Sequence, residues 1–135
     1  MMNSKFALII GNSEFQDTKL AQLATPVEDV SGLADVLNGP DICNFDEVIP
    51  FINANAATAL RPIAGFFAGK DHNDLLLLYF SGHGVLDGHG HLYLAFPYTE
   101  YKLLSGTAVA ASFLNPQLRR LKPHDRSQTQ KNPAL

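Results

Sequence analysis

A histidine between two glycines, directly after an apolar run, is the group in this sequence best placed for chemistry. Leu75–Phe80 is an unbroken apolar run, and Ser81, Gly82, His83 and Gly84 follow it. Imidazole exchanges protons near neutral pH, so His83 is a candidate general acid or base, although a histidine in such a turn can also be an ordinary polar turn residue. Sites in α/β sheets form beyond the carboxyl ends of strands, and flanking glycines let a ligand approach the backbone.

A second kind of chemistry, metal binding, is suggested by four residues that lie close together in the sequence. His83, Asp87, His89 and His91 fall within nine positions, and imidazole and carboxylate are zinc ligands. The hairpin expected here puts Asp87 and His89 at an exposed tip, where polar residues are common without any metal. We therefore keep metal binding as an alternative and predict no metal and no cofactor.

The elements that must position these residues follow an alternating pattern. Strands, helices and a hairpin are predicted, in chain order, at Lys5–Ile10 (strand), Val27–Leu37 (helix), Asp46–Phe51 (strand), Asn55–Ala68 (helix), Leu75–Phe80 (strand) and Val85–Leu86 with His91–Ala95 (hairpin). Alternating strands and helices indicate a parallel sheet with right-handed crossovers. The fold class is therefore α/β, a three-layer sandwich with a mainly parallel sheet. The continuous apolar strand before His83 is expected at the sheet's centre.

Prolines and capping residues define the ends of these elements. Thr25, Pro26 and Glu28 form a capping-box pattern at the start of the first helix, with Thr25 as N-cap. Pro50 indicates that the second strand lies near a sheet edge or ends there. Pro62 falls inside the second helix, which predicts a kink or a late start.

Composition indicates one folded domain and excludes several classes of protein. The chain has 135 residues, of which 46% are hydrophobic and 17% charged, and its net charge is −3. No basic surface for nucleic acid and no membrane span is predicted, and no glycine-rich phosphate-binding motif follows the first strand. The short apolar run near the N-terminus does not suit a signal peptide, so a cytoplasmic location is expected. Cys43 is the only cysteine, so no internal disulfide can form.

The domain is expected to end near residue 121. Ser112 is predicted to cap a short helix that carries Phe113 and Leu114, while the segment from Lys122 to Asn132 holds no apolar residue except proline. Such a segment cannot bury enough surface to fold. Residues 1–121 are therefore predicted to form the domain and residues 122–135 a disordered tail.

These residues resemble the N-terminal part of the caspase and metacaspase catalytic domain. The matching segments are Phe6–Asn12, Val27–Leu37 and Asp74–Gly84, of which the last is the specific one. The resemblance implies that His83 is the histidine of a cysteine peptidase dyad and that Gly84 supplies a backbone N–H to an oxyanion hole.

By the same resemblance, three further residues are candidates for substrate binding. Asp29 and Ser81 resemble parts of an acidic pocket that selects a basic residue before the scissile bond, and Asn12 would line the same rim. The expected substrate is accordingly a peptide or protein.

The chain departs from the family pattern in lacking its nucleophile. In the family a later strand carries an acidic residue and the catalytic cysteine, whereas here a polar segment stands at that place, so C-terminal strands are expected to be missing. Cys43 lies in the connection between the first helix and the second strand. In a parallel sheet such a connection lies at the end opposite to His83. We therefore expect a partial, truncated domain that is inactive alone unless complemented by the missing half. A non-catalytic module that pairs or self-associates through an open sheet edge is the alternative.

Overall fold

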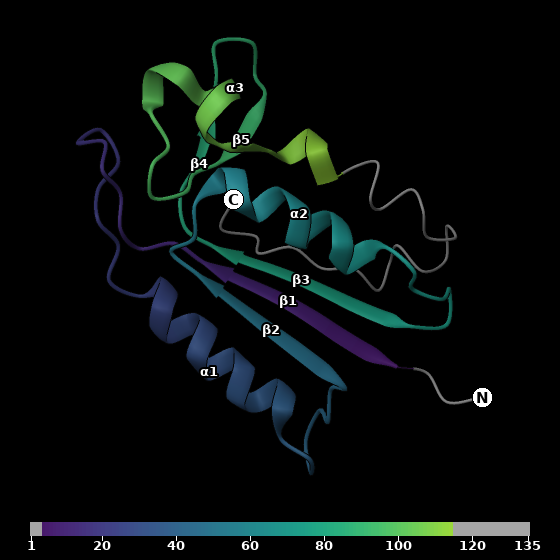
Figure 1. Cartoon of the computed structure of the whole chain (residues 1–135). Helices are drawn as coiled ribbons and strands as arrows, with labels where there is room; N and C mark the ends of the chain where they lie inside the picture. Colours follow the sequence, from purple (N-terminus) through teal and green to yellow (C-terminus); the bar gives the residue numbers. More distant parts are fainter. Residues whose placement is uncertain (1–3, 115–135) are drawn as a thin grey trace.

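The computed structural model describes residues 4–114, which form two sheets and their covering helices (Figure 1). The elements are β1 (Lys5–Gly11), α1 (Pro26–Asn38), β2 (Glu47–Ile52), α2 (Ala56–Phe67), β3 (Leu75–Ser81), β4 (Gly84–Leu86), β5 (Leu92–Leu94), the 3-10 turn η1 (Tyr101–Leu103), α3 (Leu104–Thr107), β6 (Val109–Ala110) and the 3-10 turn η2 (Ala111–Phe113). The predicted strands and helices up to β5 are confirmed to within one or two residues. The predicted tail, residues 122–135, lies outside the described residues.

The main sheet is parallel, in the order β2-β1-β3. Lys5 of β1 lies opposite Leu75 of β3, and Gly11 lies opposite Ser81, so the two strands end together. Among the described residues β1, not β3, is the central strand, which corrects the expectation that the strand before His83 would be central. β3 has one described neighbouring strand, but helices cover both of its faces. This burial is enough to explain why its sequence is continuously apolar.

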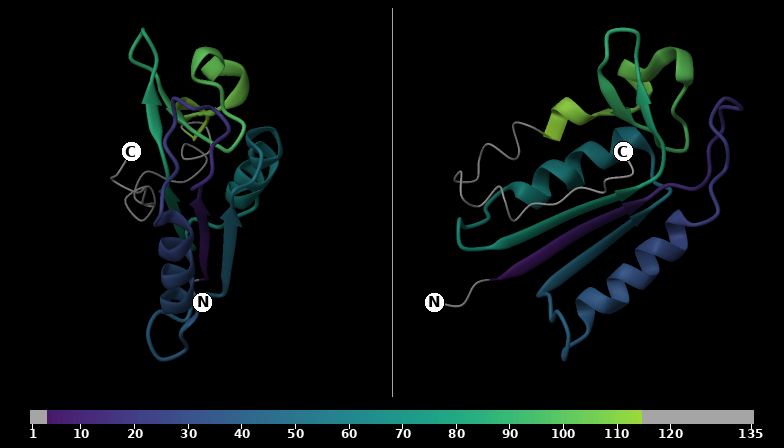
Figure 2. Two further views of the ribbon diagram at one scale, coloured as in Figure 1. Left: turned by 90° about the vertical axis from the view of Figure 1, so that its left-hand side faces the viewer. Right: turned by 180° about the vertical axis from the view of Figure 1, so that it is seen from behind.

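Alternate side chains of β1 pack into two apolar layers, and the left view of Figure 2 shows α1 and α2 on opposite sides of the sheet. Leu8 and Ile10 belong to the buried cluster that includes α2, whereas Ala7 and Ile9 belong to the one with Val30 of α1. The sheet is therefore covered by α2 on one face and by α1 on the other. This arrangement confirms the three-layer α/β sandwich.

The helix starts are fixed in different ways. Thr25 is the N-cap of α1, as predicted, but its side chain makes no capping hydrogen bond, because its backbone is already helical with φ −99° and ψ −20°. Asn55 caps α2 through a hydrogen bond from the Ala57 amide at 2.8 Å. The expected late start at Pro62 is wrong: α2 begins at Ala56 and continues through Pro62.

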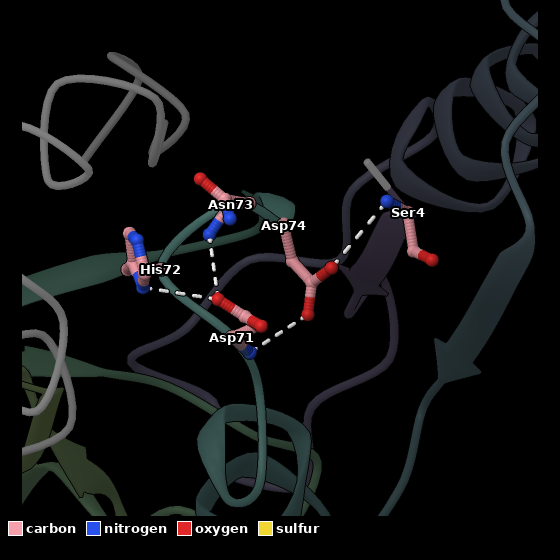
Figure 3. Close-up of polar contacts among 5 residues, drawn as sticks. All are labelled: Ser4, Asp71, His72, Asn73 and Asp74. Carbon is pink, nitrogen blue, oxygen red and sulfur yellow. Dashed lines mark hydrogen bonds and ion pairs between the residues drawn. The ribbon is translucent and has the colours of Figure 1, made fainter. Parts of the chain in front are cut away.

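Polar contacts join the amino ends of β1 and β3 (Figure 3). The Asp74 carboxylate accepts hydrogen bonds from the amides of Asp71 and Ser4, at 2.8 and 3.4 Å, and the Leu75 amide donates to the Ser4 carbonyl at 2.8 Å. These bonds fix the register of β3, and with it the place where β3 ends beside His83.

A smaller antiparallel sheet, in the order β4-β5-β6, lies beyond the carboxyl ends of the main strands (Figure 1). β4 and β5 form the predicted hairpin, whereas β6 and α3 were not predicted. Val85 and Ala95 of the hairpin pack with Phe15, Leu20 and Leu104 in a separate apolar cluster. The loop between β1 and α1 is thereby packed against the hairpin that follows His83.

Candidate functional site

His83 lies in the link between β3 and β4, at the carboxyl end of the main sheet. Its ring is half-buried, and its Nε2 lies 2.8 Å from the carbonyl oxygen of Ala21. The Phe15 ring lies against it, with 4.9 Å between ring centroids and an angle of 57° between the planes. The loop between β1 and α1 therefore holds the imidazole from two sides.

The contact with Ala21 fixes which ring nitrogen can act as a base. A carbonyl oxygen only accepts hydrogen bonds, so Nε2 must carry a proton and donate it. In the neutral ring Nδ1 then has the lone pair, and no described residue hydrogen-bonds to it. The geometry suits proton transfer at Nδ1 of His83.

Asn53 holds the loop that carries Phe15 and Ala21, and sequence reasoning missed it. Its Oδ1 accepts hydrogen bonds from the backbone amides of Ser13 and Glu14, at 2.9 and 3.2 Å, and its backbone N–H donates to the Gly11 carbonyl. Its φ of +50° suits asparagine better than most residues. The sequence signal available was an asparagine directly after the second strand.

A carboxylate ties the same loop to the segment after the hairpin. Asp17 accepts hydrogen bonds from the amides of Tyr101 and Lys19, at 2.7 and 2.9 Å. These two donors, Tyr101 first, hold the pKa of Asp17 below its usual value, because they stabilise the ionised carboxylate. The loop that supports His83 is thus held by Asn53, which follows β2, and by Tyr101, which follows the hairpin.

Gly84 presents its amide to solvent. The Ala95 amide donates to the His83 carbonyl and the Asp87 amide to the His91 carbonyl, both across the hairpin. Because antiparallel pairs alternate, the N–H and C=O of Gly84 must point away from β5. Gly84 is exposed, so this N–H is available to a ligand beside the imidazole.

The structure brings Asp29 and Ser81 together. The Ser81 hydroxyl donates to Asp29 Oδ2 at 3.3 Å, and this bond joins the end of β3 to the first turn of α1. Ser81 is buried and Asp29 is exposed. The pair therefore presents a carboxylate on the surface at the same end of the sheet as His83.

Asn12 is in a different position from the other candidates. Its side chain is fully buried, and its Nδ2 donates to the Ala95 carbonyl at 3.1 Å, while its backbone amide donates to the Ser81 carbonyl. Asn12 thus lies beneath the rim rather than on it, and it links the end of β1 to β3 and to the hairpin. Its Oδ1 has no hydrogen-bond partner among the described residues.

Cys43 is far from His83. The Lys5 ammonium group donates to the Cys43 carbonyl at 2.9 Å, which puts Cys43 beside the first residue of β1. His83 follows the opposite end of the sheet, and a seven-residue strand spans about 20 Å. The only thiol of the chain is therefore out of reach of the imidazole.

The four possible metal ligands do not gather. His91 Nδ1 lies 3.2 Å from Asp87 Oδ2 and the His89 ring is next to that of His91, but the His83 ring is directed to Ala21. Among residues 4–114 no group of three or more histidine, cysteine, aspartate or glutamate side chains could hold a metal ion. Asp87 instead accepts hydrogen bonds from backbone amides of the hairpin tip.

Comparison with protein families supplies the assignment that this geometry suggests. The caspase domain model matches residues 4–121. The chain belongs to the caspase-domain family. No curated protein matched the chain in a separate search. The family match agrees with the parallel sheet and its two helix layers, and it supports a caspase-like peptidase class.

Within residues 4–114, no helix combines the length and the apolar character needed to cross a bilayer.

Proposed function

We propose that this caspase-family chain supplies the histidine half of a cysteine endopeptidase site and has no peptidase activity alone. His83 would take a proton from a thiol through Nδ1 and later give it to the leaving amine. The Gly84 N–H would stabilise the oxyanion, where such a donor is worth about 3–4 kcal/mol. The observation that carries the proposal is the ordered imidazole of His83, with Nδ1 unbonded by any described residue and the Gly84 amide beside it.

Inactivity of the chain alone follows from the position of its one thiol. Cys43 lies at the amino end of the sheet, so the only thiol of this chain does not reach His83. The sulfur would have to come from a complementing polypeptide. We therefore propose that peptide cleavage needs this chain together with a cysteine-bearing partner.

Asp29 supports a preference for a basic residue before the scissile bond. Its exposed carboxylate, held by the Ser81 hydroxyl, would pair with an arginine or lysine side chain of the substrate. Asn12 would contribute indirectly, by holding the backbone at Ser81 and Ala95.

The first experiment uses fluorogenic peptides with Arg, Lys or Asp before the scissile bond. The chain alone should give no turnover above the blank. Turnover that His83→Ala abolishes would overturn the claim of inactivity, and further loss with Cys43→Ser would mean that the lone thiol reaches the site.

The second experiment tests the role of His83 by complementation. A caspase-family peptidase inactivated at its own histidine is mixed with this chain or with its His83→Ala variant. Recovery of arginine-directed cleavage with the parent chain but not with the variant supports the proposal. Equal results with both chains would refute it.

A second candidate function is a non-catalytic interaction module. The Leu75 amide donates to Ser4 and the Asn12 amide to Ser81, so alternation directs the backbone groups of Leu76, Leu78 and Phe80 away from β1. No described strand pairs with that side of β3. Such an edge favours pairing with another strand, from a second copy or a relative.

A further inference from the structure

The outer edge of β4 carries backbone groups that no described residue uses. Val85 exchanges hydrogen bonds with β5, as the alternation across the hairpin requires, so Gly84 and Leu86 both direct their N–H and C=O away from it. Within residues 4–114 β4 is the first strand of its sheet and has β5 as its only neighbour. Two donors and two acceptors therefore line one side of a strand that begins directly after His83.

The side chains along β4 divide into a buried one and an exposed one. Val85 is 8% exposed and belongs to the apolar cluster under the hairpin, whereas Leu86 is 63% exposed. Exposed strand edges are usually protected by charged residues or proline, but β4 contains only glycine, valine and leucine. An accessible, uncharged edge with an exposed leucine suits an extended apolar peptide segment.

We propose that the edge of β4 at Gly84 and Leu86 binds the substrate backbone as an added strand. The inference rests on the proposed function, because it extends the site at His83. A peptide carbonyl that accepts from the Gly84 N–H lies beside the imidazole, and it is the scissile one. The peptide residue two positions away then lies opposite Leu86, so an apolar side chain is favoured there.

This arrangement gives the edge a defined part in cleavage. Pairing at Gly84 and Leu86 holds two peptide residues, two positions apart, in an extended conformation, which fixes the direction of the scissile carbonyl relative to His83. Main-chain hydrogen bonds supply affinity that is independent of sequence, while the contact with Leu86 adds selectivity. The substrate class is therefore an extended peptide with a basic residue at the scissile carbonyl and an apolar residue two positions from it.

The direct test is a backbone N-methyl scan of one peptide against the full chain. The probe is fluorescein-labelled Thr-Val-Thr-Arg-Thr-Val-Thr with an amidated end, whose valines lie two positions to either side of the arginine. An added strand of either polarity uses alternate residues. N-methylation should therefore weaken binding, measured by fluorescence anisotropy, by about tenfold at alternate positions and little at those between. Equal effects at all positions, or no binding, would overturn the proposal.

A pair of variants tests the edge from the protein side. Leu86→Pro removes an outward N–H and the leucine side chain but no hydrogen bond across the hairpin, and an edge strand tolerates proline at such a position. Leu86→Thr keeps that N–H and shortens the apolar side chain. Binding should fall by about tenfold for proline and by less for threonine. Unchanged hydrogen exchange of the Ala95 and Asp87 amides, which bond across the hairpin, verifies that the hairpin is intact in both. Parent-like binding by Leu86→Pro with an intact hairpin would refute the proposal.

The outcomes separate this inference from the proposed function. An alternating N-methyl pattern without histidine-dependent cleavage in the complementation experiment would support peptide binding at the β4 edge and refute the peptidase role. Histidine-dependent cleavage without the alternating pattern would support the peptidase role and refute peptide binding at the edge.

Discussion

At the scale of single residues, the site depends on side chains that fix backbone and loop positions. Ala21 supplies only a carbonyl oxygen, yet that oxygen sets the protonated nitrogen of His83. Asn53 in turn holds the start of the loop that carries Ala21, through two amides and the Ser13 hydroxyl. The imidazole is therefore oriented by groups whose residue types give no hint of catalysis.

Replacing Asn53 by alanine should loosen this loop. Asn53→Ala leaves the amides of Ser13 and Glu14 without their acceptor and keeps a φ of +50° that alanine disfavours. We expect a loss of roughly 1–3 kcal/mol in the free energy of unfolding, measured in urea. Hydrogen exchange at Ser13 and Glu14 should also accelerate.

Asn73→Ala is the matched control for that change. Asn73 is exposed in the turn before β3, and within the described residues its side chain makes no hydrogen bond (Figure 3). Its replacement should change stability by no more than about 0.5 kcal/mol. Similar losses from both variants would contradict the role assigned to Asn53.

At the scale of elements, α1 approaches the end of β1 so closely that only glycine fits at position 11. A Cβ atom on Gly11 would lie 2.6 Å from Val30 Cγ2 and 2.8 Å from the Pro26 carbonyl oxygen. That contact brings the first turn of α1, with Asp29, to the same end of the sheet as Ser81.

Gly11→Ala should therefore separate the helix from the strand. We expect roughly 1–3 kcal/mol less stability in urea unfolding, and a weaker contact between Asp29 and Ser81. Gly32→Ala, inside the same helix with no atom within 4 Å of its added Cβ, should instead gain about 0.5–1 kcal/mol. A neutral effect of Gly11→Ala would show that the helix moves away without cost.

The hairpin tip depends on an ionised Asp87. The backbone N–H of His91, first, and that of His89 hold the pKa of Asp87 below its usual 3.8, because both donate to the carboxylate. A lowered folded-state pKa means that Asp87 stabilises the tip above about pH 3.8, and that this contribution disappears as the pH falls through the folded pKa.

An NMR titration from pH 6 to pH 2 tests the sign of this dependence. The amide signals of His89 and His91 should move with a midpoint below 3.8, the usual pKa of aspartate. In Asp87→Asn, which keeps an acceptor oxygen but does not ionise, that transition should disappear. A midpoint above 3.8 in the parent protein would contradict the assignment.

The elements of the main sheet were predictable because their signals are local. Apolar runs, helical spacing and a proline in an edge strand are enough to predict β1, α1, β2, α2 and β3. The order of strands was not, since the continuous apolar run of β3 suggested a central position that β1 occupies. Likewise β6 has two residues, and its pairing with β5 depends on contacts distant in sequence.

The candidate site divides in the same way. His83 is a candidate from its motif, whereas Gly84, Asp29 and Ser81 are candidates through the resemblance alone. Asn53 and Ala21 were not predictable, because a backbone carbonyl carries no side-chain signal and a single asparagine after a strand is common.

At the scale of the whole molecule, the described fold exposes two strand edges near one site. β4 ends its sheet on the side that continues from His83, and β3 ends the main sheet on the side away from β1. The first is short and begins at the site, whereas the second is longer, with the buried side chains of Leu76, Leu78 and Phe80. We expect peptides at the first edge and whole protein strands at the second.

Association through β3 should show in sedimentation velocity as an average mass that rises with protein concentration. Tyr79 is half-buried on the face of β3 that packs toward α1, so Tyr79→Lys puts a charge on this edge strand and should shift the chain toward monomer. Tyr98→Lys introduces the same change at a residue that is 60% exposed and belongs to no strand, so it should leave association as it is. Circular dichroism verifies that both variants are folded. A parent chain that is monomeric at every concentration, or equal effects of the two lysines, would mean that β3 recruits no second chain, because a charge disrupts strand pairing only where the strands meet.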